Sequence, residues 1–139
     1  MDKKAIKPDT IAIGIMWDRL VSLCDEFFNA LARTSFSPVV REGHDLACII
    51  LDSQARSLAQ GRYVGASFTG TAPQSAKALL THYSLDDLSP GDTIITNDPW
   101  IGTGHLLDIT MLRPVFYDEQ IIAFTSTVAH VPDIGGTGM

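Results

Sequence analysis

Two long apolar segments separated by only two residues constrain the fold of this chain more than any other feature of its sequence. Residues 109–117 and 120–128 each have the composition of a β-strand, and residues 118–119 form a tight turn between them. Strands joined by so short a turn pair antiparallel, so a hairpin is expected. Its open end brings Asp108, which precedes the first strand, next to Ala129, which follows the second.

A long amphipathic helix is expected near the start of the chain. From about residue 10 to Thr34, apolar residues recur at steps of three and four, which places them on one face of a helix. This face consists of Ile13, Met16, Leu20, Leu23, Phe27 and Ala30. Asp9 or Thr10 is the expected N-cap residue. Covering a sheet is the expected role of the helix, and binding a partner protein is the alternative.

Shorter patterns complete the expected fold. Residues 46–51 form a continuous apolar run typical of a buried strand, with residues 57–59 as its hairpin partner. The Gly/Ser/Thr-rich stretch 61–73 is expected to be an ordered loop, residues 73–83 a second helix, and residues 93–96 a further strand. These elements predict an α+β fold: a long N-terminal helix packed on a mixed, largely antiparallel sheet that is part of a larger domain.

Histidines and aspartates gather in the turns beside the predicted hairpin. His105 and Asp108 lie three residues apart before its first strand, and His130 follows its second strand. The hairpin brings these three side chains together. Two imidazoles and a carboxylate suit zinc, manganese or iron and leave coordination positions open. The alternative is that both histidines simply hydrogen-bond the backbone of glycine-rich turns, and the pattern alone leaves both explanations open.

Three further residues are candidate catalytic residues. Asp98 and Asp133 lie in Asn-Asp-Pro and Pro-Asp-Ile-Gly segments, where aspartate is a common turn residue but is also able to orient a ligand imidazole. Arg41 forms a charged cluster with Glu42 and Asp45. A buried ion pair between the helix end and the sheet is one interpretation of this cluster. An arginine contact with a carboxylate or phosphate is the other.

Composition excludes several classes of function. The net charge of −6 and the absence of basic clusters argue against a nucleic-acid or anionic-membrane partner. No apolar run reaches the roughly 20 residues needed to span a bilayer. Cys24 and Cys48 lie in apolar surroundings without CxxC spacing, so we expect buried free thiols and a cytoplasmic protein.

A family resemblance adds to these expectations. It is carried by Thr34–Pro38 with Arg41, Glu42 and Asp45, then Pro90–Asp92, Asn97–Pro99, Gly102–Thr110, Arg113–Phe116, Ala129–His130 and Asp133–Gly136. In this order, across nearly the whole chain, the segments resemble the N-terminal part of the hydantoinase B family. That family includes the large subunits of ATP-dependent N-methylhydantoinases and of acetone and acetophenone carboxylases, and the C-terminal half of 5-oxoprolinases.

The resemblance implies a metal-dependent enzyme subunit. His105, Asp108 and His130 match the family residues that bind a divalent metal. Residues 1–139 would be one N-terminal fragment of a hydantoinase B-type domain, inactive alone, from an enzyme that acts on a cyclic amide or a ketone. A hydantoinase A-type partner subunit would use ATP within a hetero-oligomer. The alternative function is a non-catalytic structural or assembly module of such a complex, acting through the N-terminal helix.

Overall fold

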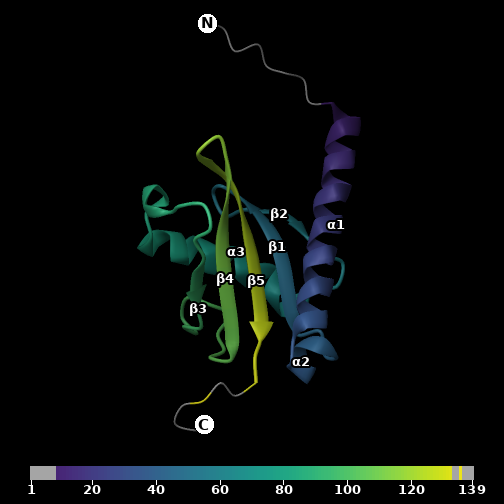
Figure 1. Cartoon of the computed structure of the whole chain (residues 1–139), viewed down its shortest axis with the longest axis vertical. Helices are drawn as coiled ribbons and strands as arrows, with labels where there is room; N and C mark the ends of the chain where they lie inside the picture. Colours follow the sequence, from purple (N-terminus) through teal and green to yellow (C-terminus); the bar gives the residue numbers. More distant parts are fainter. Residues whose placement is uncertain (1–8, 133–134, 136–139) are drawn as a thin grey trace, which may run out of the picture.

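The computed structural model describes residues 9–132 and residue 135. Its centre is a five-stranded antiparallel sheet with the strand order β2-β1-β5-β4-β3 (Figure 1). The strands are β1 (Leu46–Asp52), β2 (Ser57–Gln60), β3 (Ile94–Thr96), β4 (Asp108–Tyr117) and β5 (Gln120–His130). The helices are α1 (Thr10–Thr34), α2 (Pro38–Arg41), α3 (Ala66–His82) and a 3-10 turn, η1 (Leu85–Asp87). The predicted α+β class is confirmed.

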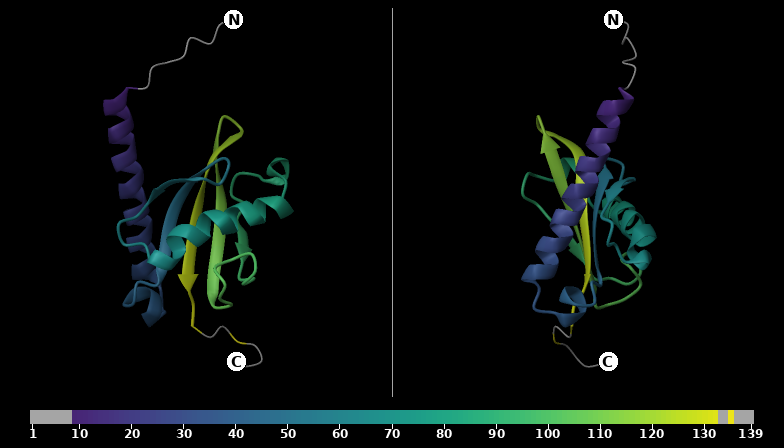
Figure 2. Two further views of the ribbon diagram at one scale, coloured as in Figure 1. Left: turned by 180° about the vertical axis from the view of Figure 1, so that it is seen from behind. Right: turned by 90° about the vertical axis from the view of Figure 1, so that its right-hand side faces the viewer.

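Helices pack on both faces of the sheet: α1 covers the end formed by β1 and β2 on one face, and α3 crosses β1, β5 and β4 on the other. Successive side chains of a strand point to opposite faces, so alternate residues of β1 enter different cores. Leu46, Cys48 and Ile50 pack against α1 and α2, whereas Ala47, Ile49 and Leu51 pack toward α3. Figure 2 shows α3 crossing the face of the sheet that is hidden in Figure 1.

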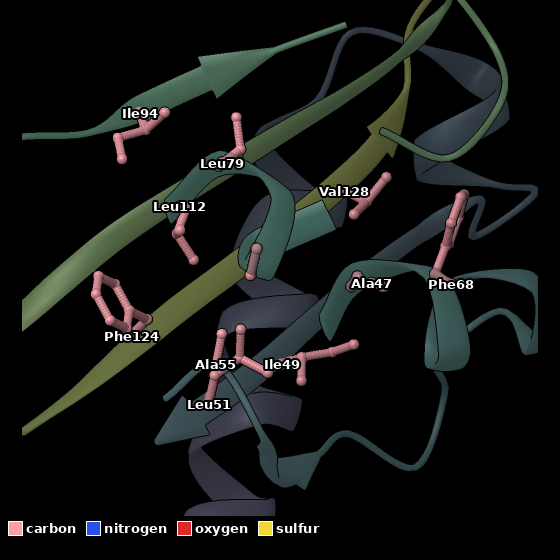
Figure 3. Close-up of a cluster of buried hydrophobic side chains, with 12 residues drawn as sticks. Ala47, Ile49, Leu51, Ala55, Phe68, Leu79, Ile94, Leu112, Phe124 and Val128 are labelled. Carbon is pink, nitrogen blue, oxygen red and sulfur yellow. The ribbon is translucent and has the colours of Figure 1, made fainter. Parts of the chain in front are cut away.

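The larger core fills the space between the sheet and α3. From the β4–β5 hairpin it takes Leu112, Phe124 and Val128, each with no exposed surface (Figure 3). From α3 it takes Phe68, Ala72, Ala76 and Leu79. These helical residues recur at steps of four, four and three, which is the spacing of one helix face.

The predicted hairpin is confirmed, and its turn has an unusual composition. β4 and β5 pair antiparallel, with Tyr117 opposite Gln120. Asp118 and Glu119 form the turn with φ angles of 46° and 63°. A two-residue turn with positive φ at both positions matches the right-handed twist of the strands. Aspartate is common at the first position, but glycine is the usual residue at the second, where this chain has Glu119. The backbone of Glu119 is therefore strained in this short turn.

The predicted start of the second helix is wrong. We expected a loop over residues 61–73, but α3 begins at Ala66 and Pro73 lies inside it. Phe68 and Ala72 continue the apolar face into the core, and this burial outweighs the poor helix propensity of glycine, serine and threonine. A proline within a helix forfeits one backbone hydrogen bond, which the packing also offsets.

The predicted apolar face of the first helix is wrong in part. The helix itself, capped by the Asp9 side chain, is confirmed. However, Ile13, Met16 and Phe27 are 43%, 58% and 41% exposed. The buried residues of α1 are Cys24, Asp25, Phe28 and Ala32. Only the C-terminal half of α1 lies along the sheet, while its first turns extend beyond it (Figure 1).

Two smaller expectations can be compared with the described residues. Cys24 and Cys48 are buried free cysteines, as predicted. Among the described residues, no helix has the length and the apolar character needed to cross a membrane.

Candidate metal centre

The pairing of β4 with β5 places Asp108 and His130 next to each other at the open end of the hairpin. The two residues are direct partners in the β4–β5 ladder, on the face of the sheet that α3 covers. The Nδ1 atom of His130 lies 2.8 Å from Oδ1 of Asp108. An ionised carboxylate only accepts hydrogen bonds, so His130 donates through Nδ1 and keeps the lone pair of Nε2 free.

His105 approaches the same point from the turn before β4. Its ring centre lies 5.0 Å from that of His130. Ligand atoms of His105, Asp108 and His130 all lie within 4.8 Å of one another. The three residues that the sequence singled out as metal ligands therefore converge, and their donor set is one that a divalent transition metal accepts.

A pocket of about 320 Å³ opens in front of these three residues. It is lined by Asp45, Ser67, Phe68, Thr71, Thr103, His105, Asp108 and His130. The first two turns of α3 thus form the wall opposite the histidines. Because part of the predicted loop is a helix here, Ser67 and Thr71 reach the pocket from consecutive turns of α3.

Neighbouring groups hold the candidate ligands in place. The hydroxyl of Thr103 donates to Oδ2 of Asp108 at 2.5 Å, and Asp108 is buried. The backbone N–H of Leu107 donates to Nδ1 of His105 at 3.1 Å. The bond from Thr103 is of the kind that fixes the orientation of a carboxylate ligand, and the bond from Leu107 fixes the His105 ring in this structure. Each oxygen of Asp108 retains a second lone pair for an ion.

Asp45 joins the site, which sequence reasoning missed. Its Oδ2 atom lies 3.9 Å from Nδ1 of His130, and its backbone carbonyl accepts from the His130 N–H at 3.0 Å. This proximity follows from the pairing of β1 with β5, which sets Leu46 opposite Ala129. In the sequence, the only sign of this role was that Asp45 directly precedes the predicted buried strand 46–51.

The other predicted site residues lie elsewhere. Asp98 accepts a hydrogen bond from the Trp100 N–H at 2.9 Å in its own turn and is not among the residues that line the pocket. Arg41 lines a different pocket, on the side of α1 and α2. Asp133 lies outside the described residues. The catalytic roles of these three residues stay predictions.

Comparisons with known proteins agree on one family. The family model for hydantoinase B/oxoprolinase matches residues 9–139. The 5-oxoprolinase of Saccharomyces cerevisiae is 34% identical over 130 residues, covering 92% of this chain and 10% of the relative. The beta subunit of the caprolactamase of Pseudomonas jessenii is 29% identical over 128 residues, covering 92% of this chain and 22% of the relative.

A solved structure shares the fold. A nucleotide-free acetone carboxylase matches with a TM-score of 0.81 and 22% identity, covering 94% of this chain and 17% of its own. The chain thus spans less than a quarter of the length of each of these three proteins. Since the family model extends over all but its first eight residues, the chain belongs to the hydantoinase B/oxoprolinase family.

Proposed function

We propose that this chain is the N-terminal, metal-binding portion of a hydantoinase/oxoprolinase-type subunit. The complete enzyme would use ATP either to open a cyclic amide or to carboxylate a ketone. One observation carries the proposal: ligand atoms of His105, Asp108 and His130 lie within 4.8 Å of one another at a pocket. Family membership supports the class of enzyme.

The donor set fits Zn²⁺, Mn²⁺ or Fe²⁺. When bound, the ion would supply Lewis acidity that polarises the carbonyl group of an amide or ketone. Asp108 faces Nδ1 of His130, so an ion held by both residues would sit at Nδ1 and take the place of the proton that joins the two atoms. His105 accepts at Nδ1, so its neutral ring carries the proton on Nε2. Binding through Nε2 would therefore require the other tautomer and the loss of the bond from Leu107.

Asp45 would complete the set of acidic groups. It lines the pocket beside His130 and has no hydrogen bond that fixes its carboxylate among those of the described residues. An unrestrained carboxylate is able to turn toward an ion or to accept a proton from a bound water. The pocket, at about 320 Å³, is of a size that suits a small cyclic amide or ketone.

ATP would be used by a second protein. A hydantoinase A-type partner subunit would bind it, and the two proteins would form a hetero-oligomer. The name of the caprolactamase relative, a beta subunit, supports a multi-subunit enzyme. Acetone carboxylation by the enzyme with the matching structure is described as ATP-dependent, which supports the use of ATP by the complex.

Metal content is the direct test. The purified chain, dialysed against Zn²⁺, Mn²⁺ and Fe²⁺ in turn and then desalted, should retain close to one equivalent of one of these ions by elemental analysis. His130→Ala should lose it, and in the assembled enzyme the same change should abolish turnover. His82→Ala is the matched control, because His82 is exposed at the end of α3 and outside the pocket. A wild-type chain that retains none of the three ions, or equal retention by His130→Ala, would overturn the proposal.

A second candidate function is an assembly module, and one observation favours it. The first turns of α1 carry exposed apolar side chains: Ile11, Ile15, Met16 and Trp17. Exposed patches of this kind often mark interaction sites. Trp17→Asp should then prevent co-purification with the partner subunit while Leu85→Asp, a change at an exposed leucine of η1, does not. Co-purification of Trp17→Asp at the wild-type level would count against this role.

A further inference from the structure

A second pocket, of about 550 Å³, lies on the other side of the sheet. It is lined by Asn29, Ala32 and Arg33 of α1, by Arg41 of α2 and by His44 in the turn that follows. The ring of His44 packs edge-on against Phe28, with the ring centres 5.4 Å apart. The pocket is therefore bordered by three nitrogen-rich side chains from three separate segments.

This pocket is lined by two arginines for which no ion pair is found among the described residues. The protein has six arginines, and Arg19, Arg56 and Arg62 each form an ion pair with a carboxylate. Among the described residues, no such pair is found for Arg33 or Arg41, and no aspartate or glutamate lines their pocket. Two arginine side chains thus line one pocket, without a carboxylate in its lining, in a chain whose net charge is −6. Like charges repel, so an anion bound between them would be favoured.

We infer that this arginine pocket binds the phosphoryl group of a small molecule. A guanidinium presents a planar set of donors that suits two oxygens of one phosphate, and two such groups match a doubly charged anion. The imidazole of His44 and the amide of Asn29 offer further polar contacts. The volume exceeds what a free phosphate ion fills, and it lies within the range of small-molecule pockets.

A structural explanation for the two arginines also exists. Arg33 lies in the last turn of α1 and Arg41 in the last turn of α2, where a cation is favoured by the helix dipole. That explanation predicts that neutralising either arginine lowers stability without any effect on phosphate binding. The two explanations therefore differ in a measurable property. The inference does not rest on the metal proposal, because neither arginine lines the metal pocket.

Phosphate titration of the ¹⁵N-labelled chain tests the inference. Inorganic phosphate, added at constant ionic strength, should cause saturable amide shifts in Asn29, Arg33, Arg41 and His44. Arg33→Gln and Arg41→Gln should each weaken binding about tenfold or more, which is the effect of one lost charged hydrogen bond. Arg113→Gln is the matched control, because Arg113 is an exposed arginine of β4 for which no ion pair is found among the described residues. Its affinity for phosphate should equal that of the wild type.

Three results would overturn the inference. The first is a wild-type chain that shows no saturable shift with phosphate. The second is wild-type affinity in a folded Arg33→Gln, Arg41→Gln double variant. The third is acetate that binds as tightly as phosphate, since that would assign the pocket to carboxylates. Each variant is checked for the wild-type spectrum first, and because both side chains are exposed, folding should be preserved.

Discussion

Removal of the Asp25 carboxylate should destabilise the fold more than removal of its partner. Asp25 lies on α1, and its oxygens accept from the backbone N–H of Arg62 at 2.8 Å and from the Nε of Arg62 at 2.7 Å. The side chain of Asp25 is 9% exposed, whereas that of Arg62 is 72% exposed. The contact ties α1 to the segment that leads into α3, and α3 contributes to the lining of the candidate metal pocket.

The exposed fractions of the two side chains determine how much stability each substitution should remove. Asp25→Ala leaves the partly buried Arg62 N–H without its partner, at about 1–3 kcal/mol, and it also removes the bond to the guanidinium. The exposed guanidinium of Arg62 is hydrated again when this bond is lost, so it contributes the smaller part of the destabilisation. We expect a loss of about 3 kcal/mol for Asp25→Ala. Arg62→Ala should cost clearly less than Asp25→Ala, because the backbone N–H still reaches the carboxylate.

The pH dependence of this contact has a definite sign. Burial raises the pKa of Asp25, but the backbone N–H and the guanidinium of Arg62 outweigh it, and the net pKa lies below its usual value of 3.8. A carboxyl group with a lowered pKa in the folded state stabilises the fold above its unfolded pKa, which is about 3.9. This stability is lost as the pH falls through the lower, folded pKa. Asp25→Ala should therefore differ from the wild type at pH 7 and converge with it in acid.

Urea denaturation, followed by circular dichroism at pH 7 and at pH 3 or below, measures both effects. Equal destabilisation by Asp25→Ala and Arg62→Ala at pH 7 would refute the assignment of the larger share to the backbone hydrogen bond. A difference between wild type and Asp25→Ala that stays constant down to pH 2 would refute the ionised state of the carboxylate as its source.

Two further predictions concern the hairpin turn and the thiols. Glu119→Gly should raise the free energy of unfolding by up to about 1 kcal/mol, because glycine relieves the positive φ of 63° at this position; a lower urea midpoint for this variant would contradict the reasoning. Burial raises the pKa of the Cys24 thiol to about 11 and that of the Cys48 thiol to about 12. Ellman's reagent at pH 8 should therefore label neither cysteine in the native chain and both in urea, whereas rapid native labelling would show that a thiol is accessible.

Local sequence signals were sufficient to predict the hairpin that carries Asp108 and His130. A two-residue turn allows few registers, so the apolar segments on either side of it fix the pairing of β4 with β5. The turn register alone would set Asp108 opposite Ala129. A bulge between Val115 and Phe116 shifts the pairing by one residue and sets Asp108 opposite His130 on the same face of the sheet, with His105 in the adjoining turn. The start of α1 was equally predictable, because an N-cap aspartate acts within its own turn of helix.

The sequence by itself thus determined the hairpin, the long helix, and the position of His105, Asp108 and His130 at one end of the hairpin, because each depends on residues close together in the chain. The bulge between Val115 and Phe116, which puts Asp108 and His130 on one face of the sheet, was found only in the structure. The tertiary structure alone decided the buried face of α1, the early start of α3 and the arrival of Asp45 beside His130. These features depend on β1 pairing with β5, a strand more than sixty residues later, and on a core that α3 completes. Burial against distant partners outweighs local propensity there, and no short pattern encodes which distant partner a segment meets.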